Sequence, residues 1–226
     1  MRKDHPAIAK ITRPTLPDVF SRQRLFKLLD QSRRCPVTWI SGPPGSGKTT
    51  LIANYIENKK LPCLWYQIDE GDGDIATFFY YLGLAGKKAA PRTRRPLPLL
   101  TPEYQFGIPA FTLRFFEDLF SRLKPPFSFV LDNYQDAVDG SPVHEAVVNG
   151  LSALPPGVRV HIVSRSGPPP AFARMQANSG ISVIGWEELR MTPEETKAVM
   201  RLRTGKPQSK DAAMHLHEKT QGWAAG

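Results

Sequence analysis

Cysteine and long apolar runs are scarce in this sequence. Its two cysteines, Cys35 and Cys63, have no metal-binding spacing, which excludes a disulfide framework and a cysteine-rich metal site. The longest uncharged apolar stretch, residues 75–86, is far shorter than the roughly 20 residues of a membrane span. The N-terminus also lacks the apolar segment of a secretory signal. We therefore expect a cytoplasmic protein with reduced thiols and no contact with a membrane.

Acidic residues are in the minority, but the excess of positive charge is local. The formal net charge of +9 is concentrated in residues 1–34 and in the short segment 87–95, which holds five Lys/Arg and no Asp/Glu. Basic runs of this kind are usually solvated loops, and no recognition-helix or zinc-finger pattern accompanies them. The charge therefore does not predict direct DNA binding by this chain.

The remaining composition is that of a globular α/β protein. Of the 226 residues, 41% are hydrophobic and 23% are charged, and the length fits one main domain with a small addition. Short apolar runs alternate with stretches of helical periodicity, which is typical of parallel β/α units. The predicted strands cover residues 36–41, 63–68, 127–131, 158–163 and 181–184, and the predicted helices cover residues 48–60, 110–123, 143–154 and 209–220, together with segments that begin at Ile75 and Pro193.

Composition shifts divide the chain into a core and two flanking parts. Residues 35–185 form the predicted core, interrupted at 87–102 by a basic, proline-rich insert that we expect to be an exposed loop. Residues 186–226 begin a small helical domain, in which Thr192 is the predicted N-cap and Pro193 the first helical residue. The sequence ends without a helix cap or a charged tail, so we expect this domain to continue in a longer protein.

A phosphate-binding motif follows the first predicted strand. Residues 42–49 fit the pattern G-x-x-x-x-G-K-[ST] and lie between a predicted strand and a predicted helix. The glycines let backbone N–H groups face an anion, and the helix N-terminus adds its positive dipole end. We expect the lysine to reach the β- and γ-phosphates and the threonine hydroxyl to bind Mg²⁺. The motif consists of Gly42, Pro43, Pro44, Gly45, Ser46, Gly47, Lys48 and Thr49.

A second metal ligand is expected from another strand. Asp132 follows the apolar run 127–131, so the strand delivers its carboxylate to the edge where parallel sheets bind ligands. Asn133 comes next, and its amide can orient a water molecule but cannot accept a proton at neutral pH. The sequence therefore predicts a magnesium–nucleotide site with slow hydrolysis at most.

Three further sets of polar residues are less specific. Arg165 follows the strand 158–163 and fits a γ-phosphate contact or a surface position equally well. Asp69 and Glu70 end the strand 63–68 on the same edge, where turn formation and helix capping explain them better than chemistry does. The histidines form no ligand or triad pattern: they are His5, His144, His161, His215 and His217.

A series of short motifs accompanies the phosphate-binding motif in a fixed order. They are ITRP (11–14), FSRQRL (20–25), IDEGD (68–72), VLDNYQ (130–135), SRS followed by PP (164–169), ELRMT (188–192) and GWAAG (222–226). Together they resemble the nucleotide-binding module of the MalT-type STAND ATPases, the large ATP-binding LuxR-family transcription regulators. The resemblance extends over essentially the whole chain.

This resemblance implies roles for residues that the spacing alone does not assign. Residues 42–50, with Thr50 included, would hold the triphosphate, Asp132 the magnesium, and Arg165 would lie by the γ-phosphate. The N-terminal segment 1–34 would border the adenine through Arg22 and its neighbours. In this family ADP holds a resting state, inducer with ATP gives a multimer, and an output domain, often a helix-turn-helix, lies C-terminal and contacts DNA.

Two departures from the family pattern affect these expectations. The family usually reads Asp-Asp-Tyr-His at the second metal strand, whereas residues 132–135 read Asp-Asn-Tyr-Gln, which predicts nucleotide binding with poor hydrolysis. The insert at 87–102 has no counterpart in the family, so no function is carried over to it.

The sequence therefore predicts an α/β P-loop NTPase with a parallel sheet flanked by helices, followed by the start of a small helical domain. Its expected function is an ATP/ADP–Mg²⁺ binding switch in a signalling or transcription regulator, a weak ATPase at most. Three alternatives remain: a nucleotide-binding scaffold without hydrolysis, which Asn133 favours; a P-loop kinase with the arginines of 92–95 as its lid; and an AAA-type DNA-associated ATPase with Arg22 or Arg174 as arginine finger.

Overall fold

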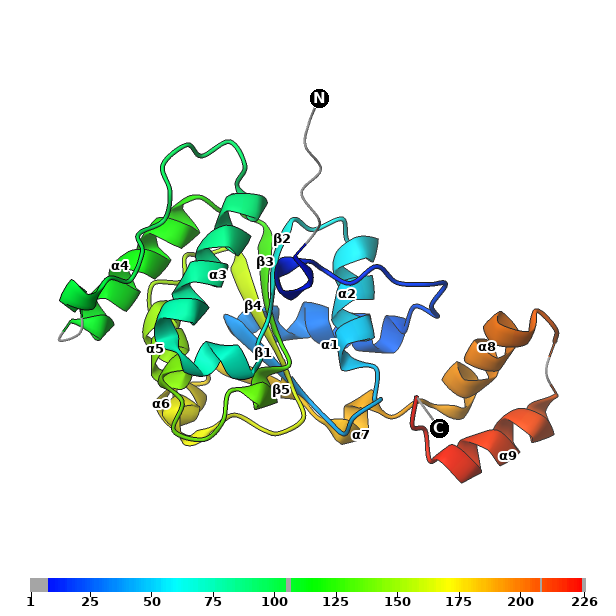
Figure 1. Cartoon of the computed structure of the whole chain (residues 1–226). Coiled ribbons are helices and arrows are strands. Elements are labelled where there is room, and N and C mark those ends of the chain that lie inside the picture. The colour runs from blue at the N-terminus through cyan, green and yellow to red at the C-terminus, as the bar shows by residue number, and fades with distance from the viewer. Residues whose placement is uncertain (1–7, 105–106, 208, 225–226) are drawn as a thin grey trace.

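Five parallel strands form the centre of the fold (Figure 1). The computed structural model describes residues 8–104, 107–207 and 209–224. Within this part of the chain the strands lie in the order β2-β3-β4-β1-β5, and each neighbouring pair is parallel. Their carboxyl ends therefore meet at one edge of the sheet. The strands are β1 (Val37–Ser41), β2 (Cys63–Gln67), β3 (Phe127–Asp132), β4 (Val158–Ser164) and β5 (Ile181–Ile184).

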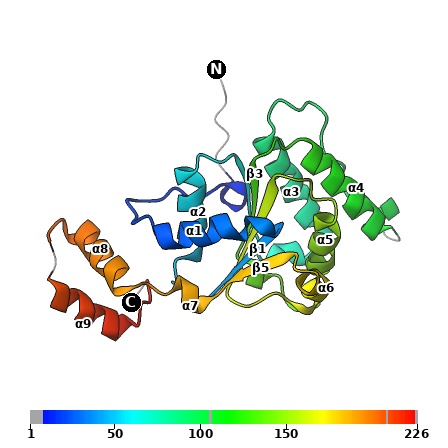
Figure 2. The same ribbon diagram turned by 180° about the vertical axis from the view of Figure 1, so that it is seen from behind.

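Helices cover both faces of this sheet (Figure 1, Figure 2). Residues of α1 and α2 pack on one face, and residues of α3, α4 and α5 pack on the other. Parallel strands buried on both faces and joined by helical crossovers have this layered form. The predicted α/β class is confirmed. The helices are α1 (Gln23–Gln31), α2 (Lys48–Asn58), α3 (Ile75–Ala89), α4 (Ile108–Ser121), α5 (Pro142–Leu151), α6 (Ala173–Ala177), α7 (Trp186–Leu189), α8 (Pro193–Thr204) and α9 (Lys210–Thr220).

Alternating side chains of each strand supply two hydrophobic cores, because successive strand residues point to opposite faces. On β1, Trp39 lies in the core beneath α3, α4 and α5, and Ile40 lies in the core beneath α1 and α2. The first core is rich in phenylalanine: the rings of Phe79 and Phe111 meet edge-on with centroids 4.9 Å apart. Packing on both faces fixes the strands, and with them the polar residues at the strand ends.

The helix starts predicted at Ile75 and Pro193 are present, and each has a side-chain cap. The carboxylate of Asp74 accepts the N–H groups of Ala76 and Thr77, and the hydroxyl of Thr192 accepts that of Glu195. The helix expected over 143–154 instead ends at Leu151, because the bonds that follow are of the tighter i→i+3 type ahead of Pro155. Helix α1 was not predicted, although Leu25, Phe26 and Leu29 give it an apolar face.

The basic insert at 87–102 is more ordered than the exposed loop that we expected. Helix α3 runs to Ala89, so the first residues of the insert are helical. Leu97 is 7% exposed and belongs to the larger core. The lack of a side chain at Gly86 makes room for it, since a Cβ there would lie 2.8 Å from Leu97 Cδ1. The insert is therefore anchored at its centre, with Arg92, Arg94 and Arg95 exposed around the anchor.

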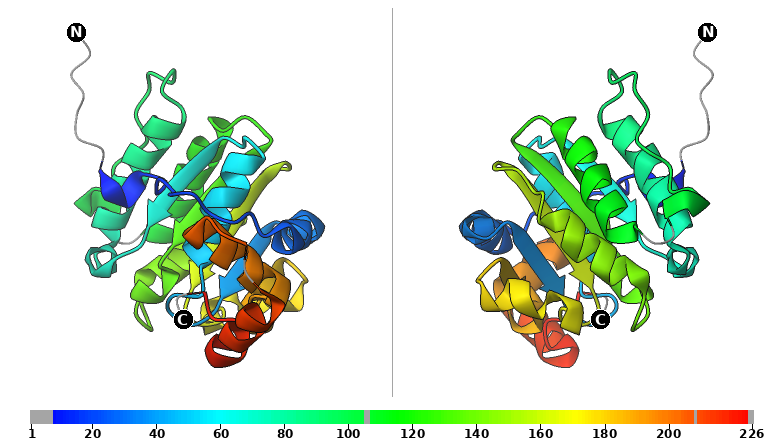
Figure 3. Two further views of the ribbon diagram at one scale, coloured as in Figure 1. Left: turned by 90° about the vertical axis from the view of Figure 1, so that its right-hand side faces the viewer. Right: turned by 90° about the vertical axis from the view of Figure 1, so that its left-hand side faces the viewer.

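The helical segment predicted after the core is also present. Beyond β5, the short helix α7 leads into α8 and α9, which pack on each other as a hairpin (Figure 1, Figure 3). Two residues of the last landmark, Ala225 and Gly226, lie outside the described residues, as does His5. No described helix combines the length and the apolar character that a membrane crossing requires. Cys35 and Cys63 are free thiols, and the reduced, cytoplasmic setting stays a prediction.

The contact between α5 and α4 yields a stability prediction. A methyl group on Gly150 would overlap the ring of Phe116, which is fully buried, so Gly150→Ala should lower the free energy of unfolding by about 1–3 kcal/mol. Gly83→Ala is the matched control, because its nearest neighbour is Leu97 Cβ at 4.0 Å. In α3 the control should raise stability by up to about 1 kcal/mol. Urea unfolding measures both; equal effects would contradict this packing.

Candidate functional site

The phosphate-binding motif forms a tight turn between β1 and α2. Gly45 and Gly47 have φ angles of 73° and 82°, in the left-handed region that favours glycine. Gly47 is the N-cap of α2 and Lys48 its first residue, so the N–H groups of the helix N-terminus face the loop. The residues thus adopt the strand–turn–helix geometry of an anion-binding loop.

The amine of Lys48 lies within this turn. Its Nζ donates to the carbonyl oxygens of Gly42 at 2.6 Å and Pro43 at 2.9 Å, and to Ser46 Oγ at 3.2 Å. Burial lowers the pKa of Lys48, and the positive charge of Arg165 lowers it further, while Asp132 acts in the opposite direction. Lys48 and Arg165 also line the same cavity, where two positive charges favour an anion.

Asp132 connects the end of β3 to this turn. Its Oδ1 accepts hydrogen bonds from Thr49 Oγ1 at 2.9 Å and from the backbone N–H of Asn133 at 3.0 Å. Burial raises the pKa of Asp132, and both hydrogen bonds and the charge of Lys48 oppose that rise. The structure therefore brings together the hydroxyl and the carboxylate that the sequence assigned to a metal, although β4 lies between β3 and β1 in the sheet.

Arg165 and Gln135 complete the same edge of the sheet. Arg165 follows β4, and its backbone N–H donates to Gln135 Oε1 at 3.0 Å, which ties the ends of β3 and β4 together. Asn133 has φ 55°, a left-handed conformation that asparagine tolerates better than most residues. These residues line a cavity of about 270 Å³, the loop cavity, whose walls are Pro44, Gly45, Gly47, Lys48, Thr49, Thr50, Asn133, Gln135, Val163 and Arg165.

A second cavity lies on the other side of the turn. This hairpin cavity has a volume of about 320 Å³ and shares Gly45, Gly47 and Thr50 with the loop cavity. Its remaining walls come from the N-terminal segment, from α1 and α2, and from α8 and the chain end: they are Pro17, Asp18, Val19, Phe20, Arg22, Phe26, Leu51, Asn54, Met191, Val199, Leu202, Arg203 and Ala224. The two cavities suit one elongated ligand with an anionic end and an apolar end.

Arg22 lines the hairpin cavity, as the resemblance implied, but its guanidinium is engaged elsewhere. It forms an ion pair with Glu195 on α8, with Arg22 Nη2 2.9 Å from Glu195 Oε2. Glu195 was not singled out from the sequence. Its position in the motif Thr192-Pro193-Glu194-Glu195 signalled a capping box, and nothing local signalled the arginine partner 173 residues away.

The end of the described chain returns to the phosphate-binding turn. The indole N–H of Trp223 donates to the carbonyl of Pro44 at 2.9 Å. Gly222, the residue before Trp223, has φ 77°. It lies so close to the chain before α8 that a Cβ on it would be 2.6 Å from the carbonyl oxygen of Met191. The backbone N–H of Met191 in turn donates to the Gly222 carbonyl at 2.8 Å. Backbone contacts therefore close the hairpin at its base.

The acidic turn after β2 has a structural role, as the sequence favoured. Lys10 Nζ lies 2.6 Å from Asp69 Oδ1 and 2.8 Å from Asp72 Oδ2. Asp72 is fully buried and also accepts the Tyr66 hydroxyl at 2.6 Å. Asp69 caps the short 3₁₀ turn that begins at Glu70. This cluster fixes the N-terminal segment to β2 and explains the carboxylates without assigning them chemistry.

The sheet and the loop at its edge define the P-loop NTPase α/β fold. Two solved structures cover most of this chain with TM-scores of 0.59: a STAND protein with a tetratricopeptide repeat sensor from Pyrococcus horikoshii, and a Walker-type ATPase from Pyrococcus abyssi. The first is 19% identical and covers 94% of this chain and 29% of its own; the second is 14% identical and covers 92% and 65%. At these identities the likeness concerns the fold.

Sequence relatives specify the resemblance further. The HTH-type transcriptional regulators MalT of Serratia proteamaculans and Vibrio campbellii are 27% and 29% identical, over 96% and 95% of this chain and 24% of each regulator. Residues 15–92 also match the family described as Nephrocystin 3, N-terminal. The resemblance to the MalT-type STAND nucleotide-binding module is thereby confirmed. The chain spans about a quarter of the length of the curated relatives it matches.

The lowered pKa of Lys48 gives a testable pH dependence. Between that lowered value and 10.5 the unfolded chain binds more protons at this residue than the folded chain, so the free energy of unfolding rises with pH. The stability of the wild type relative to Lys48→Met should therefore increase as the pH approaches 10.5 from neutrality. Urea unfolding across this range measures the difference, with Lys27→Met, an exposed lysine on α1, as control. A constant or falling difference would contradict the shift.

Proposed function

We propose that this chain is an ATP/ADP–Mg²⁺ binding switch module of a larger signalling or transcription regulator, with slow hydrolysis at most. The contact that carries the proposal is the hydrogen bond between Thr49 and Asp132, 2.9 Å long. It places a hydroxyl from α2 and a carboxylate from the end of β3 together beside the phosphate-binding turn. A turn that merely linked β1 to α2 would not require an acid from β3 at this position.

The triphosphate would be bound by the backbone of the turn and by Lys48. Successive N–H groups at the start of α2 and the helix dipole favour an anion there. The three acceptors of the Lys48 amine belong to the turn itself, so the amine is held at the place where it would contact phosphate oxygens. Arg165 supplies a second positive charge to the loop cavity. The apolar end of the nucleotide would occupy the hairpin cavity.

The donor set fits magnesium. Mg²⁺ prefers oxygen ligands and binds proteins through one or two carboxylates together with substrate phosphates. Thr49 and Asp132 offer such oxygens, and both hydrogen bonds to Asp132 reach Oδ1, so that Oδ2 is the oxygen suited to a cation. When bound, the metal would neutralise phosphate charge.

Residue 133 is the reason to expect slow turnover. Asn133 lines the loop cavity, where its amide can hold a water molecule without accepting the proton. A scaffold that binds nucleotide and does not hydrolyse it is the second candidate, and the same residue favours it. In either case the bound nucleotide, rather than continuous hydrolysis, would set the state of the protein.

Partners would lie mainly in the rest of a longer protein. The MalT relatives are about four times longer than the matched region, and they are described as HTH-type transcriptional regulators. We propose that this module acts on other domains of such a chain, that it self-associates in a nucleotide-dependent manner, and that DNA is contacted by another domain. A cytoplasmic location agrees with this role.

Lys48→Ala tests nucleotide binding. Removing a charge-assisted contact to phosphate costs about 1.5–3 kcal/mol, so the Kd for ATP and for ADP should rise roughly tenfold or more. Isothermal titration with Mg²⁺ measures both affinities. Lys27→Ala, on the exposed side of α1, should bind like the wild type. Equal affinity of the wild type and Lys48→Ala for ATP would refute the phosphate site.

Asn133→Asp tests the argument on turnover. A carboxylate here can act as general base, and such assistance is typically worth roughly 10²–10⁴-fold in rate. Single-turnover ATP hydrolysis should therefore be slow in the wild type and faster in the variant. Asn178→Asp makes the same chemical change at an exposed residue after α6 and should leave the rate unchanged. Fast wild-type hydrolysis that the substitution leaves unchanged or slows would mean that another group is the base.

A further inference from the structure

The hairpin of α8 and α9 has almost no hydrophobic core of its own. Among the described residues of α8 the buried side chains are Glu195 and Thr196, and α9 buries Ala213. Leu202 and Met214 are 44% and 38% exposed. Figure 1 shows the hairpin beside the α/β core, joined to it through α7. Apolar burial contributes little to fixing it there, and its position depends on polar contacts near its base.

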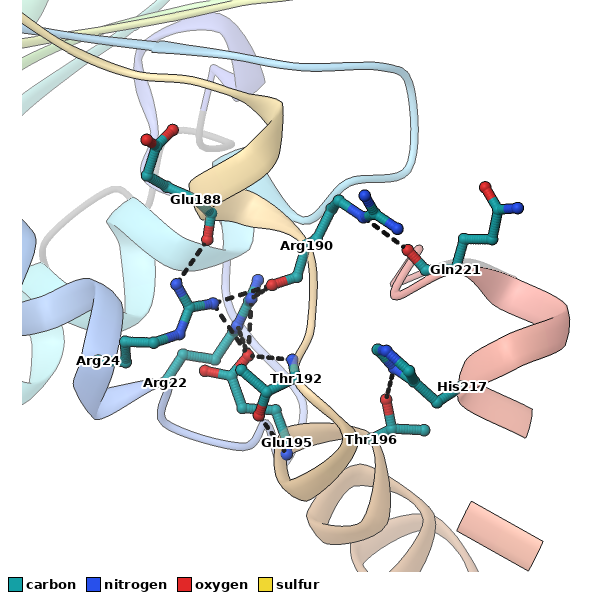
Figure 4. Close-up of polar contacts among 9 residues, drawn as sticks. All are labelled: Arg22, Arg24, Glu188, Arg190, Thr192, Glu195, Thr196, His217 and Gln221. Atoms are coloured by element: carbon teal, nitrogen blue, oxygen red, sulfur yellow. Dashed lines mark hydrogen bonds and ion pairs between the residues drawn. The ribbon is translucent and has the colours of Figure 1, made fainter. Parts of the chain in front are cut away.

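Those contacts converge on Glu195 (Figure 4). Its Oε2 accepts Arg22 Nη2 at 2.9 Å, Arg22 Nε at 3.2 Å and Arg24 Nη2 at 3.2 Å. The side chains of Arg22 and Glu195 are 8% and 9% exposed, so this pair is shielded from water and salt. Burial alone would raise the pKa of Glu195, but the hydrogen bond and charge of Arg22 and the hydrogen bonds from Arg24 and the Thr192 backbone outweigh it and hold that pKa below its usual range. The carboxylate is therefore charged at neutral pH.

The same two arginines also bind the backbone that leads into α8. Arg22 and Arg24 both donate to the carbonyl of Arg190, at 2.9 and 2.8 Å, and Arg24 donates to that of Glu188 at 2.8 Å. Figure 4 shows both guanidinium groups directed from the N-terminal side toward this stretch. Arg22, the N-cap residue of α1, and Arg24, in its first turn, thus bind the base of the hairpin both at the Glu195 side chain and at the main chain.

This ion pair adjoins the hairpin cavity directly. Arg22 is one of its lining residues, and Val199, Leu202 and Arg203 of α8 form the facing wall. Displacing α8 would therefore remove one wall of the cavity. It would also disturb the Trp223–Pro44 contact on the phosphate-binding turn, because α8 and the residues before Trp223 are joined through Met191 and Gly222.

We propose that Glu195 is a positioning residue for the nucleotide site: its ion pair with Arg22 and Arg24 clamps the α8–α9 hairpin over the hairpin cavity and thereby sets nucleotide affinity. This inference rests on the proposed function. It adds that closure of the cavity is controlled by a residue that does not line the cavity. By linkage, a nucleotide bound against α8 stabilises the clamp to the extent that the clamp strengthens nucleotide binding.

Glu195→Gln isolates the charge of the clamp. Glutamine still accepts a hydrogen bond from the backbone N–H of Thr192 and serves in a capping box as glutamate does, so the start of α8 is preserved. Glu194→Gln is the matched control: it makes the same change one residue earlier, at an exposed position in the same turn. Arg24→Gln removes one of the two cations that pair with Glu195, at a residue that does not line the cavity.

Trp223 reports on the hairpin without any nucleotide. It is 42% exposed, whereas Trp39 and Trp65 are buried. Trp186 is half-buried, so the contribution of Trp223 to acrylamide quenching is isolated by comparison with Trp223→Phe. We expect greater quenching in Glu195→Gln and Arg24→Gln than in the wild type and Glu194→Gln, and loss of that difference in a Trp223→Phe background. Circular dichroism confirms that each variant is folded.

Nucleotide affinity gives the second readout. Glu195→Gln should raise the Kd for ATP about tenfold, Arg24→Gln less, and Glu194→Gln not at all. Quenching equal to that of Glu194→Gln would overturn the clamp, and greater quenching with unchanged Kd would overturn the positioning role. If the wild type and Lys48→Ala both fail to bind ATP, the proposed function itself fails, and the positioning role with it; the quenching measurement still reports on the clamp separately.

Discussion

The hydrogen bond between Thr49 and Asp132 is the contact on which the rest of the site depends. It joins α2 to β3, although β4 lies between β3 and β1 in the sheet. This contact forms because both strand ends are fixed by cores on the two faces of the sheet. The backbone of β4 then positions Arg165 beside the same turn, and Gln135 connects the two strand ends. The positions of the polar residues at this edge of the sheet thus follow from the packing of the hydrophobic cores on its two faces.

The two cavities have different physical origins. The loop cavity is built from strand ends and a helix N-terminus within one α/β unit, so its geometry follows from the sheet. The hairpin cavity is bounded by segments far apart in the chain, from the N-terminal stretch before α1 to α8 and the chain end. Its shape depends on polar contacts between those segments. A loop cavity fixed by the sheet is therefore combined with a hairpin cavity whose walls are held by few polar contacts.

Local patterns were sufficient for the fold class and for the phosphate-binding turn, whereas Gln135 and Val163 of the loop cavity were not predicted. The P-loop, the apolar run before Asp132 and the cap at Thr192 are each defined by residues close together in the sequence. They could therefore be predicted from it. The ion pair between Glu195 and Arg22 could not be predicted, because an ion pair between distant segments leaves no local pattern in the sequence. The exposure expected for the insert was wrong at Leu97 for a related reason: a basic, proline-rich composition conceals one apolar anchor. Whether the site residues act as assigned stays a prediction.

The close approach of Gly222 to Met191 has a mechanical consequence. Because Met191 is bonded to Gly222 and Arg190 to Gln221, the two ends of the hairpin are joined to each other, and α8 and α9 form one closed loop of backbone. Within this loop, Val199 and Leu202 line the hairpin cavity, and Trp223 contacts the phosphate-binding turn. The hairpin cavity and the phosphate-binding turn are therefore connected through a single closed loop of backbone, so that a shift of one is transmitted to the other.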